Sequence, residues 1–302
     1  MRSDGISTSA SRPSSDRRRA PCAGAAPFCG VSVMTSRGRI MRTAFMTLGL
    51  MASAPASAQS LEGVDRPAGE AKPVGYLPKE TVDYRLIVGP PPAPDSLVDR
   101  IDMSISRRFQ AEVDAERWQT AQLDNKTVYP RFVEAFGRPI DRQHSPRLIR
   151  LLNRVMRDAA DPVWNGKEVF QRPRPYQRYQ LTRRCGSSPI PAPDPAPRGG
   201  SSYPSGHSVY GWATALLLAE VAPDRAAAVL ERGRDYALSR VVCGYHFPSD
   251  TEAARAIAAA VLTRLHGDPA FHADLKAAQA EHGAPAVPVP KAARKPVEAQ
   301  AD

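Results

Sequence analysis

One uncharged apolar stretch, Val209–Ala219, constrains the fold more than any other segment of this 302-residue chain. A helix needs ~20 apolar residues to cross a bilayer, so this stretch is too short to span one. It predicts instead a helix buried on all sides, which requires other elements packed around it. The rest of the sequence supplies those elements.

Apolar residues recur at three- and four-residue steps in several further segments, which is the period of a helix. These segments begin near capping residues or prolines, and several end near a glycine. The clearest are Val98–Phe109, Val128–Phe136, Ser145–Ala160, Ala226–Leu238 and Pro248–Leu265. No segment alternates with the period of a strand over a useful length. We therefore predict an all-α fold, a compact single-domain helical bundle.

Residues 41–58 have the composition of an export signal, whereas residues 1–33 resemble neither a leader nor a folded segment. Arg42 gives a basic start, Ala44–Ala52 is a short apolar core, and a small-residue cleavage pattern ends at Ala58. We expect translation to begin at Met34 or Met41 and cleavage to follow Ala58, which predicts a periplasmic protein without a membrane span in its mature form. The expected divisions are a leader in residues 1–58, a lead-in in 59–75, a folded domain in 76–272 and a disordered Pro/Ala/Lys-rich tail in 273–302.

The leader also distorts the charge of the chain. It holds eight arginines and two aspartates, so it contributes +6 of the formal +10, and the mature chain carries about +4. That mild charge does not predict a nucleic-acid partner. The sequence leaves the oligomeric state open, and a homo-oligomer is compatible with it.

Two of the four cysteines lie in the leader, which leaves Cys185 and Cys243 in the mature chain. A pair of cysteines in an exported protein predicts a disulfide, with two buried thiols as the alternative. Because Cys243 lies three residues before His246, such a bond would brace the loop that carries this histidine.

Three clusters of polar residues adjoin the predicted core segments. They are Lys167 followed after six residues by Arg174-Pro175, then Pro-Ser-Gly-His at 204–207, and then Ser239-Arg240 followed by His246 and Asp250. Three of these residues, Lys167, Arg174 and Arg240, are cations in segments that otherwise resemble core, where an unpaired charge is costly. Asp250 is the only acid in the clusters, so a bound dianion would balance the charge.

The residue types of these clusters suit an oxyanion. Arginine offers a planar fork to an oxyanion and lysine a compact point charge. At the predicted helix start, the N–H groups of Ser205, Gly206 and His207 are further donors, with the Ser205 hydroxyl as another. Gly206 leaves room for the backbone to approach the anion closely.

The two histidines supply the chemistry. His246 and Asp250 are four residues apart, so the carboxylate can bind one ring nitrogen, fix the tautomer and leave the other nitrogen free to attack. His207 comes from a different helix start and can protonate a departing alkoxide. We therefore predict phosphoryl transfer in two steps, in which His246 takes the phosphoryl group and water then removes it with His207 as the base.

The three clusters resemble, without a gap, the pattern K-x6-RP … PSGH … SR-x5-H-x3-D of the PAP2/vanadium-haloperoxidase superfamily. The surrounding SSYPSGHSVYGW and SRVVCGYHFPSD are similar to bacterial class A non-specific acid phosphatases, with Ser201 and Ser208 in place of a glycine and a threonine. The resemblance extends weakly from about Tyr76 to Leu265. It implies an all-helical periplasmic enzyme that hydrolyses phosphomonoesters through a phosphohistidine without a metal or cofactor. The positions of Cys185 and Cys243 also resemble family cysteines.

Other functions remain open at this point. A vanadate-dependent haloperoxidase would use the same residues with vanadate bound covalently to His246, and a non-catalytic periplasmic protein would bind inorganic phosphate only. A membrane lipid phosphatase would need spanning helices that the sequence lacks. A serine-hydrolase triad built on Ser205 lacks the G-x-S-x-G elbow and leaves the three cations unexplained. We expect Arg172, which has the wrong spacing from Lys167, to be solvated or to support the site from behind.

Overall fold

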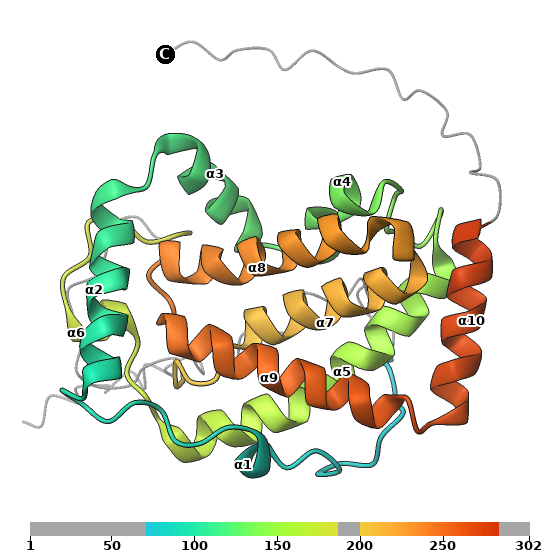
Figure 1. The fold of residues 1–302 in the computed structure, drawn as a ribbon, viewed down its shortest axis with the longest axis horizontal. Helices are drawn as coiled ribbons and strands as arrows, with labels where there is room; N and C mark the ends of the chain where they lie inside the picture. Colours follow the sequence, from blue (N-terminus) through green and yellow to red (C-terminus); the bar gives the residue numbers. More distant parts are fainter. Residues whose placement is uncertain (1–70, 187–199, 284–302) are drawn as a thin grey trace, which may run out of the picture. The chain divides into compact units, whose positions relative to one another are not determined.

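The computed structural model of the protein describes residues 71–186 and 200–283 (Figure 1). The predicted leader, nearly all of the lead-in and the Pro-rich segment 187–199 lie outside the described residues. Within the described ranges every regular element is a helix and no strand occurs, which confirms the all-α prediction. In the same ranges, no helix combines the length and apolar character that crossing a membrane requires.

The predicted core helix is the centre of the bundle. It is α7 (Gly206–Val221), and α5 (Pro146–Phe170), α8 (Ala226–Val242) and α9 (Pro248–Leu265) lie alongside it (Figure 1). Val209, Ala213 and Leu217 of α7 are fully buried. Burial around the whole circumference of α7 explains why its sequence is apolar on every face.

Two glycines bring α7 and α8 close together. A Cβ atom on Gly211 of α7 would lie 2.2 Å from the Tyr236 ring, and one on Gly233 of α8 would lie 2.6 Å from the Ala215 Cβ. Both distances are shorter than real Cβ contacts. A larger residue at either position would therefore force the two helices apart.

Shorter elements cover the bundle. The helices α3 and α4 pack against α8, the first 3₁₀ turn packs against α4, and α1 packs against α5 and α9. The bounds are α1 (Tyr84–Ile87), α3 (Ala115–Asp124), α4 (Val133–Phe136) and α6 (Pro175–Arg178), with 3₁₀ turns at Tyr129–Arg131 and Pro223–Arg225.

The helix α5 is longer than the sequence predicts. We expect it to end near Ala160, but it continues through Pro162 to Phe170. Proline removes one backbone hydrogen bond inside a helix. Here Pro162 and Val163 are buried, so packing outweighs that cost, and the extension places Lys167 in the last turn of α5.

The folded part also continues past the predicted boundary at residue 272. The last described helix, α10 (Pro269–Gly283), buries Phe271, Leu275 and Ala278 against the core. These residues recur at three- and four-residue steps, so packing of one apolar face holds the segment as a helix. The prediction of a tail from residue 273 is therefore wrong for 273–283, and residues 284–302 lie outside the described ranges.

The helix α2 (Leu97–Glu112) stands across the ends of α8 and α9 (Figure 1). Its apolar period predicts the helix, but the buried side is the polar one, made of Asp99, Asp102, Ser106 and Gln110. Leu97 is 65% exposed, Val98 50% and Ile101 47%. An amphipathic helix ordinarily buries its apolar face. The inverted arrangement of α2 means that its polar face has partners inside the protein.

Four helix ends meet beside α2 and α6. The C-terminal ends of α5 and α8 and the N-terminal ends of α7 and α9 lie at the same end of the bundle (Figure 1). An N-terminal helix end carries partial positive charge, so two of the four ends favour an anion there.

Candidate active site

The structure brings the residues predicted for the site to this end of the bundle. Each comes from a helix terminus or the loop next to one, where the chain can turn a side chain inward. Lys167 is in the last turn of α5, Arg174 is the N-cap of α6, Ser205, Gly206 and His207 open α7, Arg240 is in the last turn of α8, His246 is in the loop to α9, and Asp250 is in the first turn of α9.

Hydrogen bonds tie these segments together. Lys167 Nζ donates to the Ser201 carbonyl at 2.6 Å, and the Ser205 N–H donates to the Asp250 carbonyl at 3.1 Å. Arg174 Nη1 donates to the Tyr245 carbonyl at 3.1 Å and lies 3.3 Å from His246 Nε2. The three sequence clusters therefore form one site.

Lys167, Arg174 and Arg240, here called the cation cluster, are 5%, 3% and 1% exposed. The structure gives them carbonyl and amide acceptors, and no carboxylate of the described residues lies within ion-pairing distance of any of them. Burial and the charge of Arg174 hold the pKa of Lys167 well below its usual range, and burial lowers the pKa of Arg240 to about 10. An external anion would balance the charge of three buried cations that lack a carboxylate.

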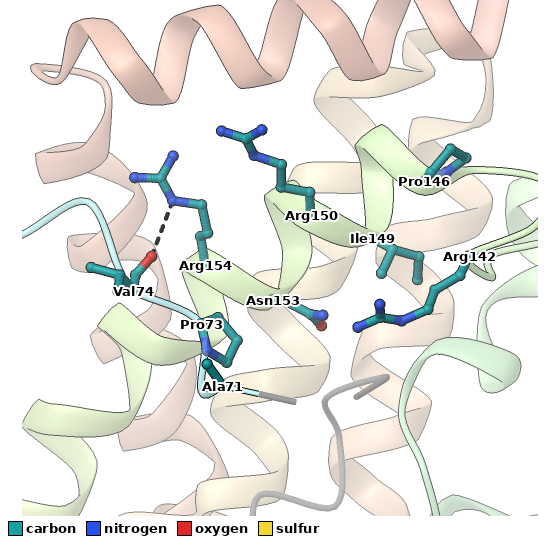
Figure 2. Close-up of a pocket in the computed structure, with 9 residues that line it drawn as sticks. All are labelled: Ala71, Pro73, Val74, Arg142, Pro146, Ile149, Arg150, Asn153 and Arg154. Atoms are coloured by element: carbon teal, nitrogen blue, oxygen red, sulfur yellow. Dashed lines mark hydrogen bonds between the residues drawn. The ribbon is translucent and has the colours of Figure 1, made fainter. Parts of the chain in front are cut away.

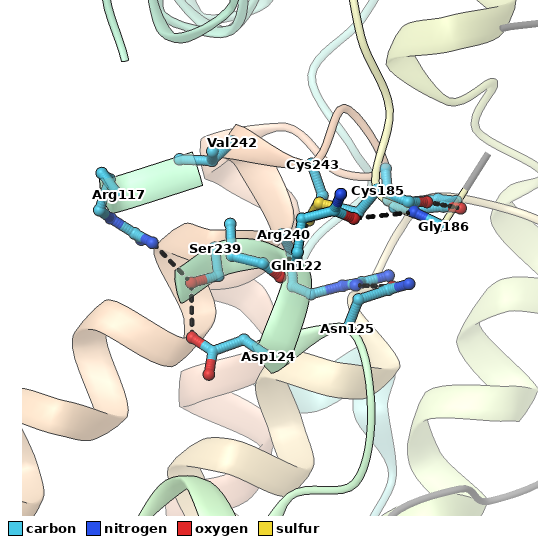
Figure 3. The surroundings of a disulfide bond; sticks show 12 residues. Arg117, Gln122, Asp124, Asn125, Cys185, Gly186, Ser239, Arg240, Val242 and Cys243 are labelled. Carbon is cyan, nitrogen blue, oxygen red and sulfur yellow. Dashed lines mark hydrogen bonds between the residues drawn. A yellow bond between two sulfur atoms is a disulfide. The ribbon is translucent and has the colours of Figure 1, made fainter. Parts of the chain in front are cut away.

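The end of α3 positions Arg240 (Figure 3). Asn125 Oδ1 accepts from Arg240 Nη1 at 2.5 Å, and beside it Ser239 Oγ donates to Asp124 Oδ2 at 2.6 Å. Arg117 donates to the same Ser239 hydroxyl at 2.9 Å. The sequence does not predict this role for Asn125, because no motif near it indicates a contact with Arg240, which lies far along the chain.

The disulfide prediction is confirmed, because Cys185 and Cys243 are bonded (Figure 3). The bond fastens the end of α8, and the next residue, Gly244, turns the chain with φ +73°. A Cβ on Gly244 would lie 2.4 Å from Leu181, so both the backbone angle and the space require glycine. This turn directs His246 into the site.

His246 is 2% exposed and lies between the cation cluster and Asp250. Its Nδ1 is 3.5 Å from Asp250 Oδ2, a charge contact too long for a good hydrogen bond, while Nε2 faces Arg174. The same carboxylate oxygen accepts a hydrogen bond from the Phe247 N–H at 2.7 Å. Burial, together with Arg174 and Lys167, holds the pKa of His246 well below its usual range. The ring is therefore neutral near pH 7 and carries an available electron pair.

The start of α7 forms another part of the candidate site. Ser205 caps the helix, since its Oγ accepts from the Ser208 N–H at 3.4 Å. The N–H groups of Gly206 and His207 have no acceptor within the helix because they lie in its first turn. A Cβ on Gly206 would meet nothing closer than Val163 at 3.9 Å, with Lys167 at 4.0 Å, so packing does not demand the glycine. The space and the donors beside Lys167 fit an oxyanion.

His207 is half-buried in the first turn of α7. Burial lowers the pKa of its ring well below the usual range, and the charges of Arg240, His246, Arg174 and Lys167 lower it further. A negative charge bound among these cations would act in the opposite direction. Protonation of His207 would therefore depend on whether an anion occupies the site.

Arg172 is not solvated, which corrects one of the two expectations for it. It is 5% exposed and donates to Asp250 Oδ1 at 2.7 Å, so it supports the site from behind. Its other partners, Asp99 and Asp102, come from α2. The sequence does not predict that Asp99 and Asp102 contact Arg172, because the pattern that predicts α2 is that of its apolar residues.

Two hollows in the described part of the chain lie away from the candidate site. A groove of about 630 Å³ runs between α5 and residues 71–74 (Figure 2), and a second hollow of about 490 Å³ is lined by residues from Ile105 to Arg117. Neither includes a predicted site residue. The candidate site differs from both hollows in its three buried cations.

Comparison with known proteins agrees with this geometry. The profile of the PAP2 superfamily matches residues 157–270, a range that contains every predicted site residue. A non-specific acid phosphatase of Providencia stuartii is 34% identical over 207 residues, which cover 67% of this chain and 82% of the relative. The chain belongs to the PAP2 superfamily. Two further relatives of this PAP2 superfamily protein are an acid phosphatase of Zymomonas mobilis, 32% identical over 66% of the chain and 75% of the relative, and a non-specific acid phosphatase of Salmonella typhimurium, 30% identical over 66% and 80%.

Proposed function

We propose that this protein is an acid phosphatase that hydrolyses small phosphomonoesters through a phosphohistidine on His246. The observation that carries the proposal is the cation cluster, three buried cations without a carboxylate partner around Nε2 of a neutral histidine. A phosphate dianion supplies the missing charge, and the N–H groups at the start of α7 add donors. The names of the relatives support the same activity.

The first step transfers the phosphoryl group to the enzyme. His246 Nε2 attacks phosphorus, the bond to the ester oxygen breaks, and His207 gives its proton to the departing alkoxide. Asp250 lies against Nδ1 and stabilises the charge that the ring gains. In the second step His207 takes a proton from water, whose oxygen attacks phosphorus while the bond to Nε2 breaks. Phosphate is released and His246 regains its electron pair.

The cation cluster carries the negative charge of the transition state throughout, a role that metal ions fill in many phosphoryl-transfer enzymes. We therefore expect hydrolysis to proceed at an undiminished rate in EDTA. Loss of activity in EDTA and its return with a divalent cation would contradict this part of the proposal.

Variants of the two histidines test the mechanism directly. His246→Ala lowers kcat for p-nitrophenyl phosphate by ~10⁴-fold or more because it removes the nucleophile, and a phosphorylated peptide containing His246 is trapped from the parent only. His207→Ala lowers kcat by ~10²- to 10⁴-fold for an alkyl phosphate. It does so less for p-nitrophenyl phosphate, whose leaving group needs no proton. His272→Ala, on the surface of α10, is the control.

The outcomes separate the alternative functions. Full activity of His246→Ala would end the proposal. A protein that retains phosphate but never turns over a monoester would be a phosphate-binding protein, and bromide oxidation only after vanadate addition would identify a haloperoxidase.

We also propose that the protein works in the periplasm. Support comes from the leader-like composition of residues 41–58 and from the Cys185–Cys243 disulfide, a bond that persists in oxidising compartments. Fractionation of cells expressing the full chain tests this. Mature protein beginning at Gln59 in the periplasmic fraction is the expected result, and full-length protein in the cytoplasm would contradict it.

A further inference from the structure

A buried ionic network connects the candidate site with α2. Arg172 lies at its centre, between Asp250 on one side and Asp102 on the other. Nη1 donates to Asp250 Oδ1 at 2.7 Å and to Ser249 Oγ at 2.8 Å, and Nη2 donates to Asp102 Oδ2 at 2.8 Å. Burial lowers the pKa of Arg172, but Asp250 and Asp102 raise it by more, so the guanidinium stays charged.

The α2 side of the network is equally buried. Asp99 and Asp102 are each 2% exposed and lie three residues apart on one face of the helix. Asp102 Oδ1 also accepts from the Ser249 N–H at 3.0 Å, while Asp99 binds Arg178 and lies 3.4 Å from Arg172 Nη2. This is why α2 buries its polar face. Burying so many charges is costly, and an apolar contact would hold the helix as well, so the network calls for a functional explanation.

The charges of the network do not cancel. Three carboxylates, on Asp99, Asp102 and Asp250, face two guanidiniums, on Arg172 and Arg178. On the site side of the network, the ring of His246 lies 3.5 Å from Asp250 Oδ2. Arg172 therefore fixes the position of Asp250 and offsets part of its negative charge. Asp102 in turn offsets part of the positive charge of Arg172.

We propose that Arg172 and Asp102 are positioning residues, which hold Asp250 against His246 and set how much of its negative charge acts on the ring. The part of this inference that concerns the reaction rests on the proposed function. The part that concerns the charge at His246 does not, because the contacts exist whatever the protein hydrolyses.

Other charged groups also face this pair. His246 is surrounded by Lys167 from α5, Arg174 from the segment before α6, His207 from α7 and Arg240 from α8, and Tyr203 and Arg172 lie near Asp250. The single variant Asp102→Asn, described below, changes none of these groups. A change in the titration of His246 in such a variant therefore reports the network.

Two opposite substitutions give the sharpest test. Arg172→Gln removes a positive charge behind Asp250, so the pKa of His246 rises, and Asp102→Asn removes a negative charge, so the pKa falls. The expected size is about 1 unit in each direction, the effect of one charge at this range in a protein interior. The double variant returns toward the parent value. The ring NMR signals of His246 in phosphate-free buffer measure all four proteins.

Kinetics supply a second measurement. In Arg172→Gln we expect kcat for p-nitrophenyl phosphate to fall by ~10- to 100-fold, as for outer partners of functional histidines, with a smaller change in KM. Arg172→Lys keeps the charge but loses the fork, so it restores the pKa of His246 and only part of kcat. Arg154→Gln is the control, because Arg154 of α5 binds Asp274 of α10 away from the site. It lowers stability without moving the pKa of His246.

Shifts of His246 in the same direction in both single variants, or in neither, would overturn the inference and leave the network a purely structural role. If Arg172→Gln does not fold, Arg172→Lys and Asp102→Asn decide: a parental pKa in the first and a lowered pKa in the second are required. A parent protein without monoester hydrolysis would refute the proposed function, while the titration of His246 would still test the network.

Discussion

Two groups of arginines in the described part of the molecule differ in whether a carboxylate lies beside them. In the open groove beside α5 (Figure 2), Arg154 binds Asp274 at 2.8 Å and the Val74 carbonyl at 3.1 Å, and the more exposed Arg150 lies 3.6 Å from the same Asp274. In the candidate site, Arg174 and Arg240 are almost fully buried and no carboxylate of the described residues lies within ion-pairing distance.

The difference distinguishes Arg154, a cation that joins two helices, from Arg174 and Arg240, which are available to an external anion. In the groove, the carboxylate of Asp274 pairs with Arg154, the less exposed of its two arginine neighbours, so Arg154 joins α5 to α10. In the candidate site, burial and the cations without a carboxylate partner lower the pKa of Lys167, His207 and His246. Positive charge without a carboxylate partner is the feature that distinguishes the candidate site from the groove.

The largest expected effect is on catalysis. Arg174→Gln lowers kcat/KM for p-nitrophenyl phosphate by ~10²- to 10³-fold, the loss typical of one transition-state donor. Arg154→Gln leaves kcat/KM at the parent value. Steady-state kinetics of both purified variants check the pair, and equal losses in the two would break the distinction between the clusters.

Inorganic phosphate should stabilise the parent protein. At a concentration 100-fold above its Kd, a ligand that binds only the folded state adds ~2.7 kcal/mol to the free energy of unfolding. We expect this gain in the parent and in Arg154→Gln, and its loss in Arg174→Gln. Denaturant unfolding with phosphate and with matched sulfate-free salt measures it. Stabilisation that survives in Arg174→Gln would place the anion elsewhere.

Without phosphate, the two clusters should also differ in stability. Arg154→Gln lowers the free energy of unfolding by ~1–3 kcal/mol, because it leaves Asp274 without its main partner. Lys167→Met removes a buried charge that its neighbours repel, so it should leave the stability unchanged or raise it slightly. Urea unfolding curves with equal m-values compare them, and a large loss in Lys167→Met would show that Lys167 holds the fold.

The last expected effect concerns pH. The pKa values of His207 and His246 are lower in the folded protein than ~6.5 in the unfolded chain, so the unfolded state binds more protons as the pH falls. The free energy of unfolding therefore falls below about pH 6.5, by at most ~1.4 kcal/mol per pH unit for each histidine. His207→Gln reduces that slope, and phosphate opposes it. A stability that does not change between pH 7 and pH 5 would contradict the lowered values.

Much of this architecture could be predicted from the sequence, because the signals were local. The periodicity of α7 and the spacings within the three clusters each depend on one short segment, and these predictions identify the helical fold and the residues that the structure brings together. A chain predicted to be exported favours a disulfide between its two remaining cysteines, and Cys185 and Cys243 are bonded.

What sequence reasoning missed depends on contacts between distant segments. The proline at 162 normally ends a helix, but packing carries α5 on to Lys167. The apolar residues of α2 indicate a core-facing side, yet ion pairs from Asp99 and Asp102 turn the helix over. The role of Arg172 is visible only once those acids lie beside it. A pattern within one segment does not reveal such a partner.

The chain on either side of the segment 187–199 is fastened to the protein. Before it, Cys185 is bonded to the end of α8, and after it the carbonyls of Gly200 and Ser201 accept from Arg174 and Lys167. Doubling the length of a flexible loop adds only ~0.6 kcal/mol to its closure. Insertions, deletions or recoding between these anchors should therefore leave the anion ligands in register, so evolution or an engineer can vary this stretch independently of the chemistry.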